Sequence, residues 1–378
     1  MPYYRVKLKP QGPFFKGINS HARKSNAIVH SDVLHTAFIY VSATVDPTWL
    51  NKIDKLKLSS IYPYYQNIYF YPRPFPPTIK QNKNTQNLSI PKETEEDSKT
   101  IDQKIWKKIH YISEGVFAEI LTNPEFFGNM EKYIQKTDTN YFLHKNEELP
   151  KKLPTTLVKE NYTISIVIDR QTNHATPFPR NFYEINTSEN VGLWFFAELD
   201  ENDKDSFKNV LEALGSLGLG GERSAGYGHF TVTEIEPFQS NNFISLTNDS
   251  QRLCLTAHKT YPLNSAITLS LYYPTIEEVK NGILNGIASY ECTVRGGWIR
   301  IAGDTIPKKL ARMCIEGSIF PAKEHEIENE GQKMKYYQPK GDVINLTPDN
   351  YQNNLTIYRS GLAFNIYFNI PQNNKEEY

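Results

Sequence analysis

Six glycines, one arginine and one histidine lie within a single stretch of the chain, LGSLGLGGERSAGYGHF at residues 214–230. A turn needs one or two glycines, so six indicate that the backbone approaches something closely or takes conformations that a Cβ would forbid. Backbone N–H groups and the guanidinium of Arg223 can hold a phosphate in such a loop. We expect the loop to follow the sugar-phosphate backbone of single-stranded RNA; the alternative is a glycine-rich connection only.

The position of this loop in the chain excludes the common nucleotide-binding loops. P-loops and dinucleotide-binding loops follow a strand and open a helix. This loop instead follows a helix-forming segment, FKNVLEALGSLG, and leads into a strand-forming one, HFTVTEI. The pattern G-x-x-x-x-G-K-[ST] is absent, and Arg223 stands where the third glycine of G-x-G-x-x-G would fall.

Histidines are the other candidates for chemistry. His21 and His30 lie in the N-terminal region and His229 flanks the glycine-rich loop, so general acid–base cleavage of RNA is one hypothesis. Asp32 and His35 lie one turn apart on an expected helix. Without a third ligand, a helix cap and a packed histidine is the preferred interpretation, and we expect no metal and no cofactor.

Aromatic residues offer stacking surfaces in two places. Trp298, in the sequence VRGGWIR, could stack on a base with Arg295 and Arg300 on phosphate, and equally could be an interface or core tryptophan. The stretch YPYYQNIYFYPRPFPP at 62–77 mixes aromatics with five prolines, so we expect it to be extended, not a central strand, and to pack against a partner protein.

Composition limits the function classes. The 378 residues carry 42 Lys+Arg and 42 Asp+Glu, so any anion-binding surface is local. Residues 1–31 contain six basic and no acidic residues, and Lys16 and Gly17 would add positive charge near the loop. The three cysteines are far apart and form no CxxC pair, which predicts free buried thiols. With no signal peptide or apolar span, we expect a cytoplasmic protein.

The elements that must position these residues follow the order strand, helix, strand, strand, helix, glycine-rich loop, strand. Alternation at Tyr4, Val6 and Leu8 predicts the first strand, and Ser31 or Asp32 can cap the first helix. TISIVID (163–169) and VGLWFFAEL (191–199) predict buried strands. The polar stretch 80–100 indicates a flexible insertion, and 132–160 a mobile arm with lysines.

This order is βαββαβ, that of a ferredoxin-like unit. The second half is also rich in strand-forming segments and has one short helical stretch, TIEEVKNGIL, so it could be a degraded copy. We therefore predict an α+β protein of two ferredoxin-like (RRM-like) domains. Residues 1–240 would form the first, with insertions near 60–105 and 130–160 and the glycine-rich loop at 215–228. Residues 241–378 would form the second.

Seven segments resemble one family in order along the chain. GLGGERSAGYGHF is similar to the glycine-rich loop of the RAMP superfamily of CRISPR proteins. LKPQGPFF, IVHSDVLHTAF, IDRQTNHAT, VRGGWI, MCIEGSIF and IYRSGLAF resemble the Csm-four family of type III-A effector complexes. Taken together, the segments span Leu8 to Phe364. The insertions at 80–100 and 132–160 are not part of the resemblance.

The resemblance implies a non-catalytic, antiviral RNA-binding subunit with two ferredoxin-like domains. Such subunits grip the repeat-derived 5′ handle of the guide RNA (crRNA) and dock the large polymerase-like subunit, beside a backbone RAMP subunit. It implies that the loop lies along the handle and that the first helix start lies nearby. With the basic and stacking candidates, the expected RNA-binding residues are Lys16, Gly17, His30, Ser31, Asp32, Gly218, Gly220, Gly221, Glu222, Arg223, Ser224, Arg295 and Trp298. The alternative function is a guide-processing endoribonuclease of the same fold, with a histidine as general acid–base.

Overall fold

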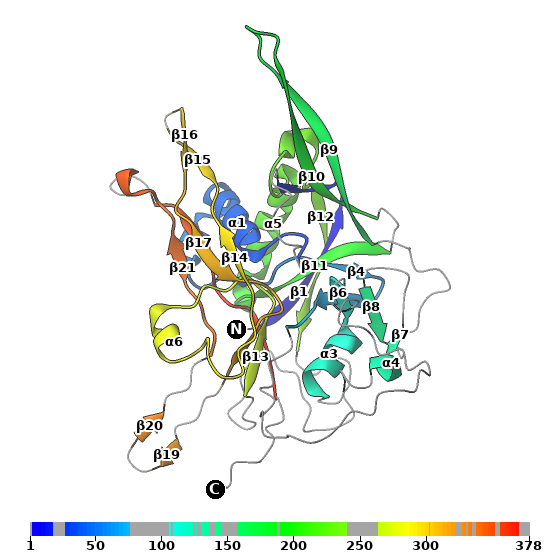
Figure 1. Ribbon diagram of the computed structural model, residues 1–378, viewed down its shortest axis with the longest axis vertical. Coiled ribbons are helices and arrows are strands. Elements are labelled where there is room, and N and C mark those ends of the chain that lie inside the picture. Colours follow the sequence, from blue (N-terminus) through cyan, green and yellow to red (C-terminus); the bar gives the residue numbers. More distant parts are fainter. Residues whose placement is uncertain are drawn as a thin grey trace, which may run out of the picture.

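Figure 1 shows the computed structural model of the chain. The residues that the structure describes are 2–17, 27–75, 106, 109–123, 126, 130–135, 141–144, 157–186, 190–239, 264–301, 303–322, 327–329, 332–334, 338–351 and 356–369. The segment 80–100 and His21 lie outside them. Within these ranges, no helix is long and apolar enough to cross a membrane.

A nine-stranded, largely antiparallel sheet forms the centre of the molecule. Its order is β12-β1-β11-β4-β5-β6-β8-β7, and β3 also pairs with β11. Only β6 and β8 run parallel among the pairs recorded for it. The strands are β1 (Tyr3–Pro10), β3 (Lys57–Leu58), β4 (Tyr62–Tyr65), β5 (Ile68–Pro72), β6 (Tyr111–Ser113), β7 (Ile134–Gln135), β8 (Tyr141–His144), β11 (Val191–Glu198) and β12 (Phe230–Phe238).

Two long helices pack side by side on this sheet: α1 (Ser31–Val45) and α5 (Lys204–Leu217). Phe38 of α1 stacks on Phe207 of α5 with ring centroids 4.9 Å apart. The chain order β1, α1, β4, β11, α5, β12 is the predicted βαββαβ, and Val6 and Leu8 are fully buried as their alternation predicted. The N-cap of α1 is His30, whose side chain makes no cap hydrogen bond, so the prediction that Ser31 or Asp32 caps the helix is wrong.

The smaller helices lie around this frame. The α-helices are α3 (Glu114–Thr122), α4 (Met130–Tyr133) and α6 (Ile276–Lys280). The 3-10 helices are η1 (Pro47–Lys52), η3 (Glu201–Asp203), η4 (Arg223–Ala225) and η6 (Asp349–Tyr351).

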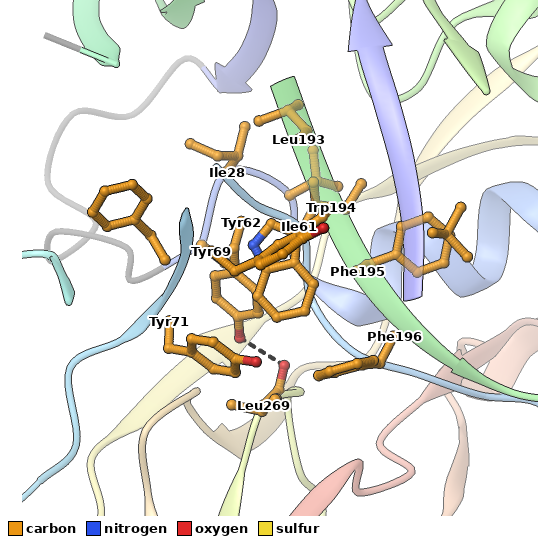
Figure 2. Packing of buried hydrophobic residues seen from close by; sticks show 14 of the residues in the cluster. Ile28, Ile61, Tyr62, Tyr69, Tyr71, Leu193, Trp194, Phe195, Phe196 and Leu269 are labelled. Carbon is orange, nitrogen blue, oxygen red and sulfur yellow. Dashed lines mark hydrogen bonds between the residues drawn. The ribbon is translucent and has the colours of Figure 1, made fainter. Parts of the chain in front are cut away.

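The aromatic–proline stretch forms the middle of the sheet, contrary to expectation. Tyr62, Phe70 and Tyr71 are fully buried, and the rings of Tyr62, Tyr69 and Tyr71 pack against Trp194 of β11 (Figure 2). Pro63 stands opposite Leu193, and the pairing between β4 and β5 covers only Tyr64 and Tyr65, so the absent N–H of Pro63 falls outside that ladder. In the part that the structure describes, residues 62–75, the aromatic side chains are buried or half-buried and belong mostly to the core.

A second correction concerns TISIVID, which is exposed. It belongs to β9 (Val158–Ile168), which pairs with β10 (Ala175–Ile185); β10 in turn pairs with β2 (Phe14–Gly17). The β9–β10 hairpin projects from the body at the top of Figure 1. Ile164 is 65% exposed and Ile166 61%. Branched apolar residues fit a strand whether or not anything covers it.

The stretch 132–160 is also more folded than expected. Its described parts include β7 and β8 of the main sheet, where Ile134 and Leu143 are buried in the main core. The segment 145–156 lies outside the described residues.

The C-terminal half is built from short antiparallel ladders. β13 (Ser265–Thr268) pairs with β18 (Ile319–Pro321) and β23 (Asn365–Phe368). Four more two-stranded ladders are formed by β14 (Cys292–Arg295) with β17 (Ala311–Cys314), β15 (Trp298–Ile301) with β16 (Asp304–Pro307), β19 (Ile327–Asn329) with β20 (Gln332–Met334), and β21 (Val343–Asn345) with β22 (Tyr358–Ser360).

One hydrophobic core joins the two halves. Ile267, Leu269 and Phe364 belong to the same buried cluster as Trp194. Phe364 stacks on Phe196 of β11 with ring centroids 5.5 Å apart, and the Tyr62 hydroxyl donates a 2.7 Å hydrogen bond to the Leu269 carbonyl (Figure 2). The second half therefore completes the core of the first.

Candidate nucleic-acid interface

The glycine-rich loop follows α5 and leads into β12, as predicted. Some of its glycines are needed because another part of the protein backbone lies too close for a side chain. A Cβ on Gly228 would lie 2.0 Å from the Leu219 carbonyl oxygen, because the Leu219 N–H donates to the Gly228 carbonyl across the loop. The Gly228 N–H donates in turn to Pro13, in the turn that leads into β2. The loop is thus fixed against the β1–β2 connection.

Gly220 is different, because no neighbouring atom would clash with a Cβ at this position. Its φ is +93°, and a Cβ there would approach only the Phe15 carbonyl oxygen, at 3.9 Å. Gly220 and Ser224 are exposed, and Gly221 is half-buried because Phe15 covers it. This half of the loop offers accessible backbone.

A cleft of about 820 Å³ opens beside this half of the loop. The last two turns of α1 and the end of α5 form its other walls. Tyr40 of α1 is 70% exposed and Leu217 of α5 is 51% exposed. The lining residues are Tyr40, Val41, Thr44, Val45, Ala213, Ser216, Leu217, Gly220, Gly221, Glu222, Arg223 and Ser224.

Arg223 supplies the available positive charge of the cleft. It is exposed, and its guanidinium has no hydrogen-bond or ion-pair partner within the described part of the chain. Its backbone carbonyl accepts a hydrogen bond from His229 Nε2 at 3.0 Å. The neighbouring Glu222 is paired with Arg180 of β10 at 2.9 Å, so it anchors the loop to the hairpin.

Lys16 and Gly17 lie close to the loop on β2. Gly17 pairs with Asn181 of β10, and Phe15 and Tyr227 pack edge to face at 6.4 Å. The Lys16 ammonium is bonded to Glu160 and has little exposed surface, so its charge is already partnered. The structure thus brings Lys16 and Gly17 together with the loop segment Gly218–Ser224.

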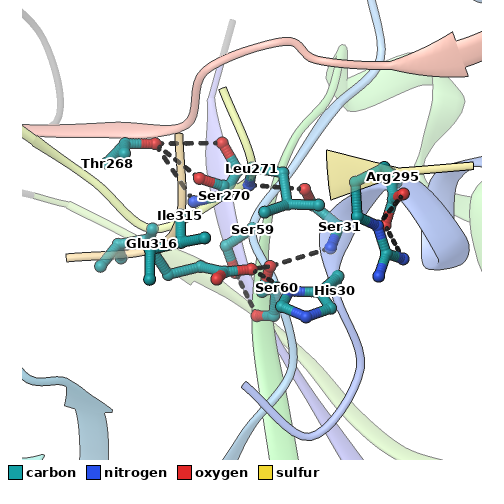
Figure 3. A network of polar contacts seen from close by, with 12 residues as sticks. His30, Ser31, Ser59, Ser60, Thr268, Ser270, Leu271, Arg295, Ile315 and Glu316 are labelled. Atoms are coloured by element: carbon teal, nitrogen blue, oxygen red, sulfur yellow. Dashed lines mark hydrogen bonds and ion pairs between the residues drawn. The ribbon is translucent and has the colours of Figure 1, made fainter. Parts of the chain in front are cut away.

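His30, Ser31 and Asp32 lie at the other end of α1. Twelve residues of helix separate Asp32 from Thr44 of the cleft, about 18 Å. All three side chains are bonded within the protein. His30 Nδ1 donates to Glu316 at 2.7 Å, and the Ser31 hydroxyl accepts from the Leu271 N–H at 3.0 Å (Figure 3). The expectation that these residues lie along the RNA has no support in this geometry.

Asp32 is buried beneath two guanidiniums. Arg295 donates from Nε and Nη2 to its two carboxylate oxygens, each at 3.0 Å, and Arg359 donates to the same group. Burial alone would raise the pKa of Asp32, but the two arginines outweigh it and hold that pKa below its ordinary value. Arg295 is therefore the partner of Asp32, and its charge is compensated.

His35 is a packed histidine, as preferred. Its Nε2 donates to the Ile53 carbonyl at 3.0 Å, and burial lowers its pKa to about 4. Among the described residues no group of three or more His, Cys, Asp or Glu side chains could hold a metal ion.

Trp298 stands on the second projecting hairpin, β15–β16, which lies on the other side of α1 and α5 from β9–β10 (Figure 1). It is 67% exposed, so it is not a core residue. Arg300 is also exposed, and alternation along a strand places it on the same face as Trp298. This hairpin combines an exposed aromatic ring with a positive charge.

Two family models match the chain, one described as the RAMP superfamily at residues 47–231 and one as the CRISPR Csm4 C-terminal domain at residues 262–368. The chain belongs to the Csm4 family of RAMP proteins. A similar curated protein, "CRISPR system Cms protein Csm4" of Methanocaldococcus jannaschii, is 26% identical over 349 residues, which cover 83% of this chain and 85% of that protein.

Chains of other solved structures align with this one along nearly its whole length. A chain of the Csm3–Csm4 subcomplex in the type III-A CRISPR-Cas interference complex aligns with a TM-score of 0.57 and 18% identity, covering 98% of this chain and all of that one. A chain of the Csm1–Csm4 cassette in complex with cA4 aligns with a TM-score of 0.48 and 14% identity, with the same coverage. The first alignment confirms the RAMP-like α+β fold.

Sequence reasoning missed Tyr40 in this Csm4-family chain. Tyr40 falls off the apolar stripe of α1 formed by Leu34, Phe38 and Val41, which is a signal of exposure that could have been read. That it faces the glycine-rich loop depends on the packing of α1 against α5, which no local pattern contains.

Proposed function

We propose that this chain is the RNA-binding subunit of a type III-A CRISPR Csm complex, in which the glycine-rich loop and its cleft hold the 5′ handle of the guide RNA. Membership of the Csm4 family supports the assignment. The observation that carries it is the exposed, unpartnered guanidinium of Arg223 beside Tyr40 in an open cleft, within the described part of the chain.

Each group of the cleft has a function in this proposal. Arg223 pairs with a phosphate, and the accessible backbone from Gly220 to Ser224 lies along the sugar-phosphate chain, whereas Gly218 is buried against the Tyr227 carbonyl. Tyr40 offers its ring to a base, a contact that tolerates any sequence. Glu222 keeps the loop on β10 through Arg180. Lys16 and Gly17 border the path, and Trp298 with Arg300 forms a second stacking surface.

We propose that the β9–β10 hairpin docks protein partners, the large polymerase-like subunit or the backbone RAMP subunit. Register places Tyr162, Ile164, Ile166 and Ile168 on one face of the hairpin, opposite Asn181, Pro179, Pro177 and Ala175. An exposed aliphatic surface of this length favours a protein partner over RNA. Such a complex would be cytoplasmic.

We propose that the chain is not itself a nuclease. His30, His35 and His229 are each hydrogen-bonded within the protein, and none of them lies beside a second general acid–base candidate in the cleft. Purified protein incubated with labelled repeat RNA is expected to leave it intact. Discrete cleavage products would favour the endoribonuclease alternative.

For the fold, we propose two ferredoxin-like units that share one core, residues 1–240 and 241–378. The main sheet supports the first, because β12-β1-β11-β4 is its strand order. The second would be a degraded copy built on β13, α6 and the strands that follow.

The test is guide retention in the assembled complex at several salt concentrations. Arg223→Ala should weaken retention by roughly 1–3 kcal/mol and lower the slope of log affinity against log salt by about 0.7. Tyr40→Ala should weaken retention with little change in slope. Lys280→Ala, an exposed charge on α6, is the matched control. Unchanged retention and slope for Arg223→Ala would mean that the loop is only a connection between helix and strand.

These two side chains are cleaner probes than the glycines. Gly220→Val would strain a backbone with φ at +93°, and a Cβ on Gly221 would lie 2.5 Å from the Phe15 ring.

A further inference from the structure

Cys292 and Cys314 face each other across two neighbouring strands, and Cys292 is exposed, contrary to the expectation that these thiols are buried. They are direct partners in the antiparallel ladder of β14 and β17, and their sulfur atoms lie 3.9 Å apart. Both are free thiols. Partners in such a ladder have Cα atoms about 4.5–5.5 Å apart, within the range that a disulfide spans.

The two thiols have unequal environments. Cys292 is exposed, whereas Cys314 is 3% exposed and packs with Tyr272 and Phe320. The hydrogen bond from the Cys314 thiol lowers the pKa of Cys292 to about 7; Arg312 adds to this effect, while burial and Glu291 oppose it. The pKa of Cys314 is raised by the same hydrogen bond and by burial.

We propose that Cys292 and Cys314 form a thiol–disulfide exchange site for low-molecular-weight disulfides such as oxidised glutathione. The Cys292 thiolate attacks one sulfur of the disulfide, forms a mixed disulfide and releases one thiolate. Cys314 then loses its proton to solvent and attacks Cys292 Sγ, which releases the second thiolate. The two cysteines lose two electrons and the small disulfide gains them.

Solvent exposure and thiol pKa determine which of the two cysteines attacks first. An attacking thiol must be ionised and reachable, which describes Cys292. The resolving thiol, Cys314, must also lose its proton before it attacks, but it has to reach only Cys292. The sulfur atoms must move from 3.9 Å to about 2.05 Å, a side-chain adjustment within an existing ladder.

The bond would connect two strands that hold the first helix in place. Arg295, three residues after Cys292, holds Asp32 of α1, and Glu316, two residues after Cys314, holds His30. Oxidation would therefore cross-link the two segments that carry Arg295 and Glu316, and would leave the contacts of these residues with the start of α1 in place.

The experiment uses the full chain carrying Cys254→Ser, incubated with oxidised glutathione, then alkylated and mapped by mass spectrometry without reduction. We expect a cross-linked peptide pair containing Cys292 and Cys314, and a rate of first modification of Cys292 that rises tenfold per pH unit below pH 7 and levels off above it. The melting temperature should rise by a few degrees on oxidation and return with dithiothreitol.

Two single variants make the assignment specific. Cys314→Ser should stop at the glutathione adduct on Cys292, with no rise in melting temperature. Cys292→Ser should leave Cys314 unmodified in the folded protein. Absence of the cross-linked peptide in the Cys254→Ser protein, or faster modification of Cys314 than of Cys292, would overturn the proposal.

Discussion

Asp32 and Arg295 are joined by two hydrogen bonds of 3.0 Å although they are 263 residues apart in the chain. Arg359 adds a third donor to the same buried carboxylate. The start of α1 is thus clamped by two strands of the C-terminal half, β14 and β22. Removal of the carboxylate would leave two partly buried cations without their partner.

Asp32→Ala should therefore lower the free energy of unfolding by about 3–5 kcal/mol, as expected when one partner of a buried ion pair is removed. Urea unfolding followed by circular dichroism measures it. Asp54→Ala, on the exposed connection after η1, is the control and should change stability by less than about 0.5 kcal/mol. A similar small loss for both variants would contradict the clamp.

His35 should make stability depend on pH. Its pKa is about 4 in the folded chain and 6.5 when unfolded, so the unfolded chain binds a proton more readily. The contribution of His35 is complete above pH 6.5 and is lost as pH falls towards 4. Between pH 7 and pH 5 the loss should be about 2 kcal/mol.

Comparison with His35→Gln isolates this contribution, because glutamine can still donate to the Ile53 carbonyl and does not titrate. The difference in unfolding free energy between wild type and variant should shrink by that amount from pH 7 to pH 5. His174→Gln, on the exposed hairpin tip, is the control. A constant difference between wild type and His35→Gln at the two pH values would show that the histidine is not held neutral.

A buried charge network fixes α3 on the main sheet. Arg5 Nη2 donates to Glu114 at 2.9 Å, and the Tyr71 hydroxyl donates to the same Glu114 oxygen at 2.8 Å. The Cζ atom of Arg5 lies 3.6 Å from the centroid of the Tyr69 ring. Glu114→Ala should cost about 3–5 kcal/mol of unfolding free energy because the Arg5 charge stays buried. Tyr71→Phe removes one hydrogen bond to a charged group and should cost about 2 kcal/mol. The reverse order of the two losses in urea unfolding would refute this account.

The exposed face of the β9–β10 hairpin should matter for assembly and not for folding. Ile164→Lys with Ile166→Lys should leave the melting temperature within about 1 °C, because both side chains are mostly exposed. The same variant should fail to co-purify with co-expressed large and backbone subunits. Thr163→Lys, on the opposite face, is the matched control and should assemble normally. Full assembly of the double variant would remove the hairpin from the docking proposal.

Sequence analysis correctly predicted those helices and strands whose signal lies within a few neighbouring residues. The alternation in β1, the apolar stripe of α1 and the helix-forming segment FKNVLEALGSLG of α5 lie in contiguous residues, and these elements are confirmed. The prediction from Pro63 was wrong because a proline removes only its own N–H, and the ladder between β4 and β5 does not include Pro63. Ile164 and Ile166 misled because strand propensity measures fit to a pleated surface and not burial.

The site was predictable only in part for the same reason. The glycine-rich loop is a contiguous signal, so its position after α5 follows from the sequence. The ion-pair partners of the site candidates are distant in the sequence. Lys16 pairs with Glu160 and Glu222 with Arg180. Arg295 pairs with Asp32, 263 residues away. Which arginine remains available could be known only once the chain had folded.

The main core, to which both halves contribute, has a consequence for how the chain can be divided. A fragment ending at residue 239 would expose the faces of Phe196 and Tyr62 that Phe364 and Leu269 cover. A fragment starting at residue 264 would lack the sheet that covers Ile267, Leu269 and Phe364. Neither piece should be soluble by itself, yet the two produced together in one cell should find each other and reconstitute a particle that behaves as the intact chain. The covalent connection only keeps the two halves at a high local concentration, and the complementary surfaces of the halves determine the structure that they form together.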